Sequence, residues 1–382
     1  MSRKKQLFIH GIRGIPASHG GFETFTEKLA PYLVDNGWDV TVYCQEHGEG
    51  EWYDGEWNGV KTIHVPVKDD GAKGSIIFDW LTVKDAIKKD GLNLTLGYNT
   101  AIYAAMFRLK GKTNVFNMDG IEWKRQKWGT LAKIWFFINE CAGNWLGNHL
   151  IADHPQIKTH LQARVSGKKI TVIPYGADRH DTADASVLPE YGLTEKGFYL
   201  VVARPEPENS ILEIVSAYSS QERNYPLVVL GNFDTENNAY HKKVVEAAND
   251  GVKFVGAIYD QNIVNAFRFY TRGYIHGHQV GGTNPSLVET LGCGSPVLAH
   301  NNRFNRWVAG EGAKYFQDQF ECKAMIDQMD ANDEHIEPMR QASYQRHSEE
   351  FQWEMVMSAY NELLTAWYDR TEQASVQYEA QK

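Results

Sequence analysis

Short apolar runs alternate with longer amphipathic stretches through the first half of the chain. In the clearest of these stretches an apolar residue recurs at every third or fourth position from Phe22, which predicts a helix over residues 22–36 with Gly37 as its C-terminal cap. The apolar runs predict strands at residues 7–9, 40–43, 62–65, 94–96, 115–117 and 150–152. Strands that alternate with helices indicate a parallel sheet with right-handed crossovers.

The same pattern restarts in the second half. Residues 170–178 predict a strand that leads into a linker lasting to about Gly197, and further strands are predicted at residues 198–203, 227–230, 253–255, 274–276 and 296–299. We therefore expect an α/β protein of two doubly wound units, residues 1–178 and 179–350, with a ligand between them at the carboxyl ends of the strands. Residues 351–382 are expected to form an amphipathic final helix, to about residue 368, and a polar tail that frays after Trp367.

The composition narrows the class of protein. The chain has 382 residues, of which 42% are hydrophobic and 23% charged, and such values are ordinary for a soluble globular protein. Its formal net charge of -9 argues against nucleic-acid binding, which needs a broad basic surface. The four cysteines form no CxxC pair, and no apolar segment is long enough for a signal peptide or a membrane span. We expect a cytoplasmic protein with reduced thiols.

A glycine-rich loop, GIRGIPASHGGFE, follows the first predicted strand. It matches neither the Walker loop nor GxGxxG, which weakens the interpretation as an ATPase or a dehydrogenase. Gly20 and Gly21 directly precede the predicted helix, so the amides there could bind an anionic group. The alternative is a flexible surface loop.

A second motif, VARPEPENS, lies at the end of the first strand of the second unit. Arg204 is expected to emerge at the carboxyl end of that strand, where a guanidinium could hold a diphosphate bidentately and stabilise it as a leaving group. The alternative is a solvated arginine in a turn.

The third motif is the most specific and runs over residues 276–299, HGHQVGGTNPSLVETLGCGSPVLA. Asn284 is a credible N-cap for a helix that begins at Pro285, so the amides of Gly282, Thr283 and Asn284 should point toward a ligand. Glu289, about one turn into the helix, could accept hydrogen bonds from a ribose diol. A purely structural strand–loop–helix would not readily explain two glycines and a glutamate here.

The same motif contains an HxH pair, His276 and His278, which could suggest a metal. No third ligand lies nearby in the sequence, so we expect both rings to be polar lining rather than metal ligands.

The fourth motif, NVFNMDGIEWKRQKW, follows a strand of the first unit. Asp119 and Glu122 are expected to face the ligand, and Glu122, Trp123 and Arg125 are candidates for contacts with an acceptor. Residues 123–138 then mix cations with aromatic side chains, a composition that suits peripheral contact with anionic lipid. A core helix with a solvated basic edge is the alternative.

Together these residues resemble the family-4 retaining glycosyltransferases of the GT-B fold. The strings GIRGIPASHGGFETF, FNMDGIEWKR and VGGTNPSLVE are similar to the bacterial rhamnosyltransferase-like branch that builds capsular and cell-wall polysaccharides. The resemblance implies two Rossmann-like domains and a final helix that crosses back to the first. It also implies that the donor nucleotide sugar is bound by Gly20, Gly21, Arg204, Gly281, Gly282, Thr283, Asn284 and Glu289, with Arg204 on the diphosphate and Glu289 on the ribose.

Two positions depart from the general family pattern. The family carries a lysine where this chain has Asn209, and a glutamate that touches sugar hydroxyls where this chain has Gly281. Asp119 stands where the family often has a histidine near the acceptor. The altered pocket is compatible with a 6-deoxy sugar such as rhamnose.

The resemblance implies transfer of a sugar, with rhamnose from dTDP-L-rhamnose as the first expectation, onto a lipid-linked or oligosaccharide acceptor with retention at the anomeric carbon. Arg204, Asp119 and Glu289 are then the candidate catalytic residues, and neither a cofactor nor a metal is expected. Two alternatives stay open, a nucleotide-sugar epimerase of the same fold and a non-catalytic sugar-nucleotide-binding protein.

Overall fold

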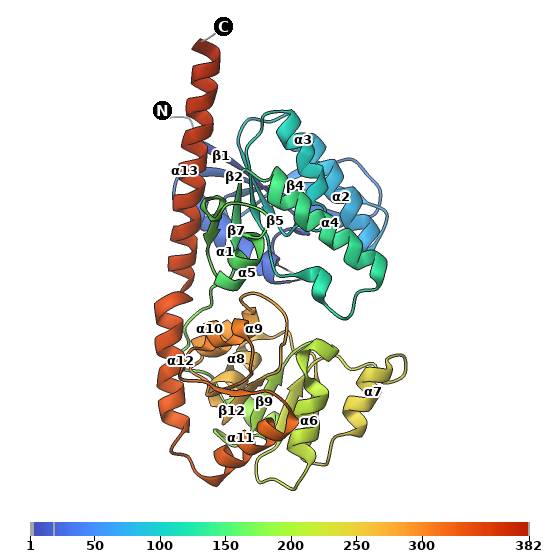
Figure 1. Cartoon of the computed structure of the whole chain (residues 1–382), viewed down its shortest axis with the longest axis vertical. Coiled ribbons are helices and arrows are strands. Elements are labelled where there is room, and N and C mark those ends of the chain that lie inside the picture. The colour runs from blue at the N-terminus through green and yellow to red at the C-terminus, as the bar shows by residue number, and fades with distance from the viewer. Residues whose placement is uncertain (1–3, 18–19, 381–382) are drawn as a thin grey trace. The chain divides into compact units, whose positions relative to one another are not determined.

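The computed structural model describes residues 4–17 and 20–380, so Ser18 and His19 of the first motif and the last two residues of the tail lie outside the described residues. The chain divides into two compact units (Figure 1). Unit 1 comprises residues 1–123, 130–174 and 353–382, and unit 2 comprises residues 124–129 and 175–352. Each unit is described by itself below.

Unit 1 contains an eight-stranded sheet in the order β3-β4-β2-β1-β5-β6-β7-β8. All neighbouring pairs are parallel except β3 and β4, which form an antiparallel hairpin at one edge. The strands are β1 Lys5–His10, β2 Trp38–His47, β3 Tyr53–Trp57, β4 Val60–Val67, β5 Leu92–Leu96, β6 Asn114–Asn117, β7 His149–Ala152 and β8 Ile170–Val172. β1 lies at the centre, and the strand order reverses between β1 and β5.

Helices cover the sheet of unit 1. They are α1 Gly21–Asp35, α2 Gly71–Ala86, α3 Ala104–Leu109, α4 Thr130–Leu146, α5 Pro155–Leu161 and α13 Trp353–Ala380, with short 3₁₀ turns η1 Ala101–Tyr103, η2 Glu122–Lys124 and η3 Gly167–Lys169. α1 buries its apolar stripe, and Gly37, with φ +85°, follows its C-cap. The final helix belongs to this unit because Tyr360 packs on Phe25 at 4.8 Å and its hydroxyl accepts from Asn117 Nδ2 at 2.7 Å.

Unit 2 repeats the same design with a six-stranded, fully parallel sheet in the order β11-β10-β9-β12-β13-β14. The strands are β9 Tyr199–Val202, β10 Leu227–Leu230, β11 Val252–Gly256, β12 Gly273–His276, β13 Val297–His300 and β14 Lys314–Phe316. Two clusters of buried apolar side chains cover the opposite faces of this sheet, one around Leu200 and Val228 and the other around Val201 and Val229. The strand order reverses between the adjacent strands β9 and β12.

The helices of unit 2 are α6 Ile211–Ser219, α7 Ala239–Glu246, α8 Gln261–Tyr270, α9 Pro285–Gly292, α10 Arg303–Ala309, α11 Gln319–Ala331 and α12 Ile336–Glu350, with 3₁₀ turns η4 Ala185–Tyr191 and η5 Pro207–Asn209. Among the residues that the structure describes, no helix combines the length and the apolar character needed to cross a bilayer.

The predicted fold class, two consecutive doubly wound parallel-sheet units, is confirmed. The structure adds two strands that the sequence pattern does not predict, β3 and β14. The final helix α13 continues past Trp367 to Ala380, into the segment where the sequence analysis expects a polar tail that frays.

Candidate functional site

The carboxyl ends of β9 and β12 lie side by side in unit 2, where the strand order reverses. Tyr199 and Leu200 of β9 pair with Gly273 and Tyr274 of β12. In open parallel sheets of this kind, ligands bind outside the carboxyl ends of the strands at the point of reversal. The two loops that leave this point are residues 203–210, after β9, and residues 277–284, after β12. They contain Arg204 and the glycine-rich sequence of the third motif.

These two loops are fastened to each other. Gly277 allows their close approach, because a Cβ there would lie 2.1 Å from the carbonyl oxygen of Asn209. The Ser210 hydroxyl donates to the Gly277 carbonyl at 2.8 Å and accepts from the Gln279 side chain at 2.9 Å. The Gln279 amide donates to the Glu208 carbonyl at 2.9 Å. The position of one loop therefore fixes the position of the other.

Arg204 is exposed at the end of β9, as the sequence predicts. Asn209 is buried, and its side-chain amide donates to the Arg204 carbonyl at 2.8 Å. Asn209 thus holds the loop that presents the arginine, and supplies no charge of its own.

The first turn of α9 is capped by its own side chains and backbone. Asn284 is the N-cap and accepts from the Ser286 amide at 3.0 Å, and Pro285 occupies the first helical position. The Ser286 hydroxyl hydrogen-bonds the Tyr274 hydroxyl at 2.8 Å, which ties the helix to β12. The amides ahead of this helix, with its dipole, favour an anionic ligand.

Gly281 is the second departure from the family pattern, and the backbone explains the residue type. Its φ is +154°, a region that side-chain-bearing residues rarely adopt, while the space where a Cβ would stand is open. The structure therefore places a glycine-dependent turn and free space at this position.

Glu289 is paired with a residue that the sequence analysis did not single out. The Glu289 carboxylate oxygen Oε2 lies 2.5 Å from Nη2 of Arg268 on α8. Arg268 is only 3% exposed, whereas the Glu289 side chain is 32% exposed. One side of the carboxylate is thus held by a buried cation while the group still reaches solvent. Arg268 could not be singled out from the sequence, because a charged residue within the helical pattern FRFY resembles an ordinary surface position.

His276 and His278 stack on each other with ring centroids 4.3 Å apart. Burial lowers the pKa of His276 well below its usual value, and burial together with the positive charges of Arg125 and Arg204 lowers the pKa of His278 to about 3. Both rings are therefore neutral at physiological pH. The charges of Arg125 and Arg204 act on the same ring, so two cations lie in the vicinity of this site.

Arg125 was predicted as an acceptor contact of the first unit. The structure groups residues 124–129 with unit 2 instead, although the chain on both sides belongs to unit 1. Because its charge bears on His278 together with that of Arg204, Arg125 fits the anion-binding group of unit 2.

The remaining sequence candidates lie in unit 1. Gly20 is the N-cap of α1 and Gly21 its first residue, and the loop before them is anchored where the Arg13 amide donates to Glu23 Oε1 at 3.1 Å. Asp119 follows β6 with φ +52°, an uncommon conformation for a non-glycine residue.

Glu122 and Trp123 are held near Asp119 by the body of unit 1. The Glu122 amide donates to the buried Tyr98 hydroxyl at 2.8 Å. The Trp123 indole donates to Glu140 Oε2 at 2.9 Å, so its polar edge is turned into the unit.

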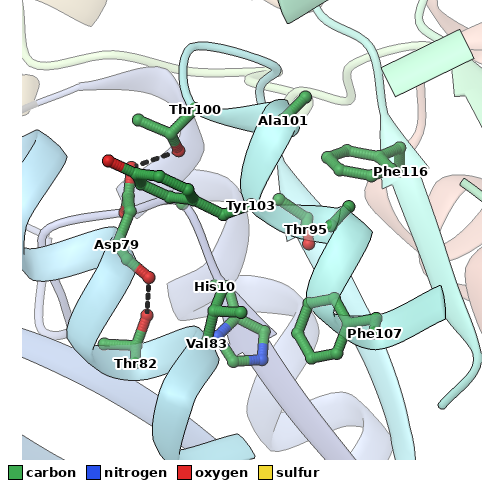
Figure 2. A pocket seen from close by; sticks show the side chains of 12 residues that line it. His10, Asp79, Thr82, Val83, Thr95, Thr100, Ala101, Tyr103, Phe107 and Phe116 are labelled. Carbon is green, nitrogen blue, oxygen red and sulfur yellow. Dashed lines mark hydrogen bonds between the residues drawn. The ribbon is translucent and has the colours of Figure 1, made fainter. Parts of the chain in front are cut away.

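A small cavity beneath α2 and α3 in unit 1 is polar on one side (Figure 2). The Thr100 hydroxyl donates to the Asp79 carboxylate at 2.6 Å, and burial raises the pKa of Asp79 to about 6. Burial lowers the pKa of His10, on the same cavity, to about 4. The cavity volume is about 20 Å³, which is enough for a single water molecule and far too small for a sugar.

No group of three or more histidine, cysteine, aspartate or glutamate side chains suited to a metal occurs among residues 4–17 and 20–380. That no metal takes part stays a prediction.

Comparison with known proteins extends the picture. A family described as "Domain of unknown function (DUF1972)" matches residues 4–178, and no curated protein matches the sequence. Among solved structures, sucrose-phosphate synthase from Thermosynechococcus elongatus superposes with a TM-score of 0.81 at 17% identity, covering 96% of this chain and 100% of that one.

Two further structures are similar over nearly their whole length. HepE from Anabaena, solved in complex with UDP, has a TM-score of 0.73 at 14% identity and covers 95% of this chain and 100% of its own. A glycosyltransferase from Rickettsia africae has a TM-score of 0.68 at 13% identity, with coverages of 95% and 98%. The chain therefore has the fold of the GT-B glycosyltransferases.

Proposed function

We propose that this protein is a glycosyltransferase that binds a nucleotide-sugar donor at the carboxyl ends of β9 and β12. The observation that carries the proposal is the pairing of β9 with β12, because Arg204, which is exposed, follows the first strand and α9, with its partly exposed carboxylate Glu289, follows the second. Cation and amides match a diphosphate, and the carboxylate matches a ribose hydroxyl. The fold supports the proposal because a nucleotide ligand accompanies it in HepE.

The donor diphosphate is bound in this proposal by Arg204, Arg125 and the amides of residues 282–284. Arg125 takes the place of the positive charge that related proteins obtain from the lysine at position 209. Gly281 leaves room for the transferred sugar, and Gly20 and Gly21 are proposed to contribute amides from α1. Thr283 and Asn284 shape the turn that aims these amides.

The reaction is group transfer with retention. The bond between the anomeric carbon and the diphosphate oxygen breaks, an acceptor hydroxyl oxygen forms the new bond on the same face, and its proton passes to the departing diphosphate. A double displacement would require a carboxylate nucleophile beside the anomeric carbon. Gly281 offers none and Glu289 is assigned to the ribose, so the front-face route is preferred. Arg204 stabilises the leaving charge, and Asp119 is proposed to contact the acceptor hydroxyl.

The finer assignments follow from the resemblance. The donor is dTDP-L-rhamnose, and a lipid-linked or oligosaccharide acceptor is bound by Glu122 and Trp123. The protein takes part in capsule or cell-surface polysaccharide synthesis. It acts in the cytoplasm at the inner face of the membrane, which it contacts through residues 123–138. No metal or cofactor is included.

A non-catalytic nucleotide-sugar-binding protein is the second candidate, because Asn209 and Gly281 remove two side chains that related enzymes carry. An epimerase of this fold is the third, and it would turn over donor without any acceptor.

Nucleoside diphosphate release from a panel of nucleotide sugars, with and without a membrane-lipid acceptor extract, separates these functions. We expect acceptor-dependent release from dTDP-L-rhamnose, and a loss of about 10²–10³-fold in Arg204→Ala. Arg303→Ala, at an arginine in the first turn of α10, is the control and should keep full activity. Release from another donor would leave the transferase and remove rhamnose. Release without acceptor would indicate the epimerase, and binding without release would indicate the non-catalytic protein.

A further inference from the structure

Helix α4 buries polar side chains and exposes apolar ones, the reverse of an ordinary amphipathic helix. The side chains that it buries in unit 1 include Asn139, Glu140 and Asn144, which are polar. Its large apolar side chains point to solvent instead. A surface helix of a globular protein normally buries its apolar stripe.

The buried polar side chains of α4 make hydrogen bonds within unit 1, although Asn144 Oδ1 has no partner among the described residues. Asn139 accepts from the Ile102 amide at 3.0 Å, and Asn144 donates to the Glu140 carbonyl at 2.8 Å. Glu140, 1% exposed, pairs with Arg164 at 2.8 Å and with His160 at 2.9 Å. The contacts with Ile102, Arg164 and His160 hold the polar side of the helix against unit 1, so its apolar side is directed outward.

The outward face is continuous along the helix. Leu131 is 84% exposed and Trp145, at the other end, is 62% exposed. Between them Ile134, Phe137 and Ile138 are also exposed, and their spacing of three and four residues places them on one stripe. The neighbouring α3 and η1 add exposed Leu109 and Ile102, and Figure 1 shows α3 beside α4 in this unit. We call the surface formed by these seven residues the α3–α4 face.

The charged residues of the segments that form the α3–α4 face are mostly cations. Residues 101–113 and 130–146 contain four cations, Arg108, Lys110, Lys112 and Lys133, and a single carboxylate, the buried Glu140. Arg108 also joins the two helices, because its Nε donates to the Leu146 carbonyl at 2.6 Å. Lys112 is paired at 2.8 Å with the exposed carboxylate of Asp90, so the positive charge of this face rests on Arg108, Lys110 and Lys133. Exposed leucine, isoleucine and tryptophan bordered by these cations complement an anionic and apolar surface.

We propose that the α3–α4 face docks unit 1 on an anionic lipid bilayer, with the apolar side chains in the headgroup region and the cations on lipid phosphates. The attraction is local, because the chain as a whole carries a formal charge of -9. The surface overlaps residues 123–138, the segment expected from the sequence, in residues 131–138 only. Trp123 and Trp135 donate their indole N–H groups inside unit 1, while Trp145 and Leu109 join the contact. This inference does not depend on the donor site.

Vesicle co-sedimentation of the full chain tests the proposal without any substrate. We expect binding to mixed phosphatidylcholine–phosphatidylglycerol vesicles that weakens as salt is raised, and little binding to phosphatidylcholine alone. Leu131→Glu, in the first turn of α4 where a carboxylate suits the helix dipole, should weaken binding about 10-fold. Lys110→Gln should weaken it roughly 5-fold. Phe320→Glu replaces an apolar residue of unit 2 that is 73% exposed, against 84% for Leu131, and should bind as wild type.

Trp145→Gln, at the other end of the face, provides a second test and should also weaken vesicle binding. All variants should keep wild-type affinity for nucleoside diphosphate, so that a loss of membrane binding can be distinguished from damage to the donor site. Equal vesicle binding by wild type, Leu131→Glu and Trp145→Gln would overturn the proposal, as would equal binding to neutral and anionic vesicles. A wild-type dimer in sedimentation velocity that Leu131→Glu abolishes, with no vesicle binding, would assign the face to a second copy of this chain instead.

Discussion

The ion pair between Arg268 and Glu289 is the contact on which nucleoside recognition depends in this account. Replacing Arg268 with methionine keeps a long side chain in the buried site but removes the charge. Replacing Glu289 with glutamine keeps its shape but leaves the buried guanidinium uncompensated. The two partners differ in exposure, 3% for Arg268 and 32% for Glu289, so the two changes should have unequal costs.

The expected magnitudes follow from that asymmetry. Removing one partner of a fully buried pair costs about 3–5 kcal/mol, because the other charge is left in a low-dielectric site. In Arg268→Met the remaining carboxylate can reach water, so we expect a smaller cost of about 1–2 kcal/mol. In Glu289→Gln the remaining cation cannot, and its Nε already lacks a partner among the described residues, so we expect about 2–4 kcal/mol. The double variant should cost about 1–2 kcal/mol less than the sum of the single changes.

Native-state hydrogen exchange at amides of α8 and α9 measures these costs in unit 2 without requiring the whole chain to unfold as one. Calorimetric titration with nucleoside diphosphate is the second readout, and both single variants should bind more weakly than wild type. Arg272→Met is the matched control. Arg272 is an equally buried arginine of unit 2 that pairs with Asp333 and donates to the Met329 carbonyl, so its loss should destabilise the unit and leave nucleotide affinity unchanged. Additive costs, or a larger cost for Arg268→Met than for Glu289→Gln, would refute the reasoning.

Three further changes test other contacts. Gly277→Ala places a Cβ against the Asn209 carbonyl and should lower nucleotide affinity at least 10-fold by displacing the Arg204 loop, as measured by titration. Arg125→Gln should weaken nucleoside diphosphate binding about 10-fold and leave nucleoside monophosphate binding less affected, if its charge serves the diphosphate. Asp79→Asn should stabilise the protein by about 1–3 kcal/mol at pH 7.5, with the gain vanishing as the pH falls toward 4, as measured by thermal melting at a series of pH values.

The sign for Asp79 follows from its raised pKa. The folded protein binds this proton more tightly than the unfolded chain does, so the contribution of Asp79 to stability increases as the pH falls from about 6 to 3.8. His10, whose pKa is lowered to about 4, acts in the opposite direction between pH 6.5 and 4. The difference in unfolding free energy between Asp79→Asn and wild type is therefore the quantity to compare. A difference that does not change with pH would contradict a buried ionised carboxylate.

Gly37→Ala serves as the control for Gly277→Ala. Gly37 has open space around it and φ +85°, and its replacement should leave nucleotide affinity unchanged.

Periodicity in the sequence was sufficient for the central strands because these are buried on both faces and read as continuous apolar runs. The predicted strand at residues 227–230, for example, coincides with β10. β3 could not be predicted in this way, since its sequence YDGEW is polar and largely exposed and it is held as an edge strand by pairing with β4. β14 has only three residues, of which Phe316 alone is buried.

The candidate site likewise contains residues that could be predicted from the sequence and contacts that could not. Arg204 and the turn before α9 could be placed from the sequence because chain order alone puts them at the ends of β9 and β12. The pairing of Glu289 with Arg268 and the approach of Gly277 to Asn209 join residues 21 and 68 positions apart, and no local pattern encodes them. The sequence also could not show which side of α4 faces the core. Its apolar stripe is typical of a buried face, but the structure buries Asn139 and Glu140 instead.

Hydrogen exchange of the wild-type protein with and without a bound nucleoside diphosphate tests the central claim most directly. The account predicts slower exchange of the amides at residues 203–210 and 277–286, the two loops at the carboxyl ends of β9 and β12, with dTDP. Protection should be absent in Arg204→Ala at the same nucleotide concentration. No protection of these two loops by dTDP or UDP, or protection confined to other parts of the chain, would contradict a donor site at this position.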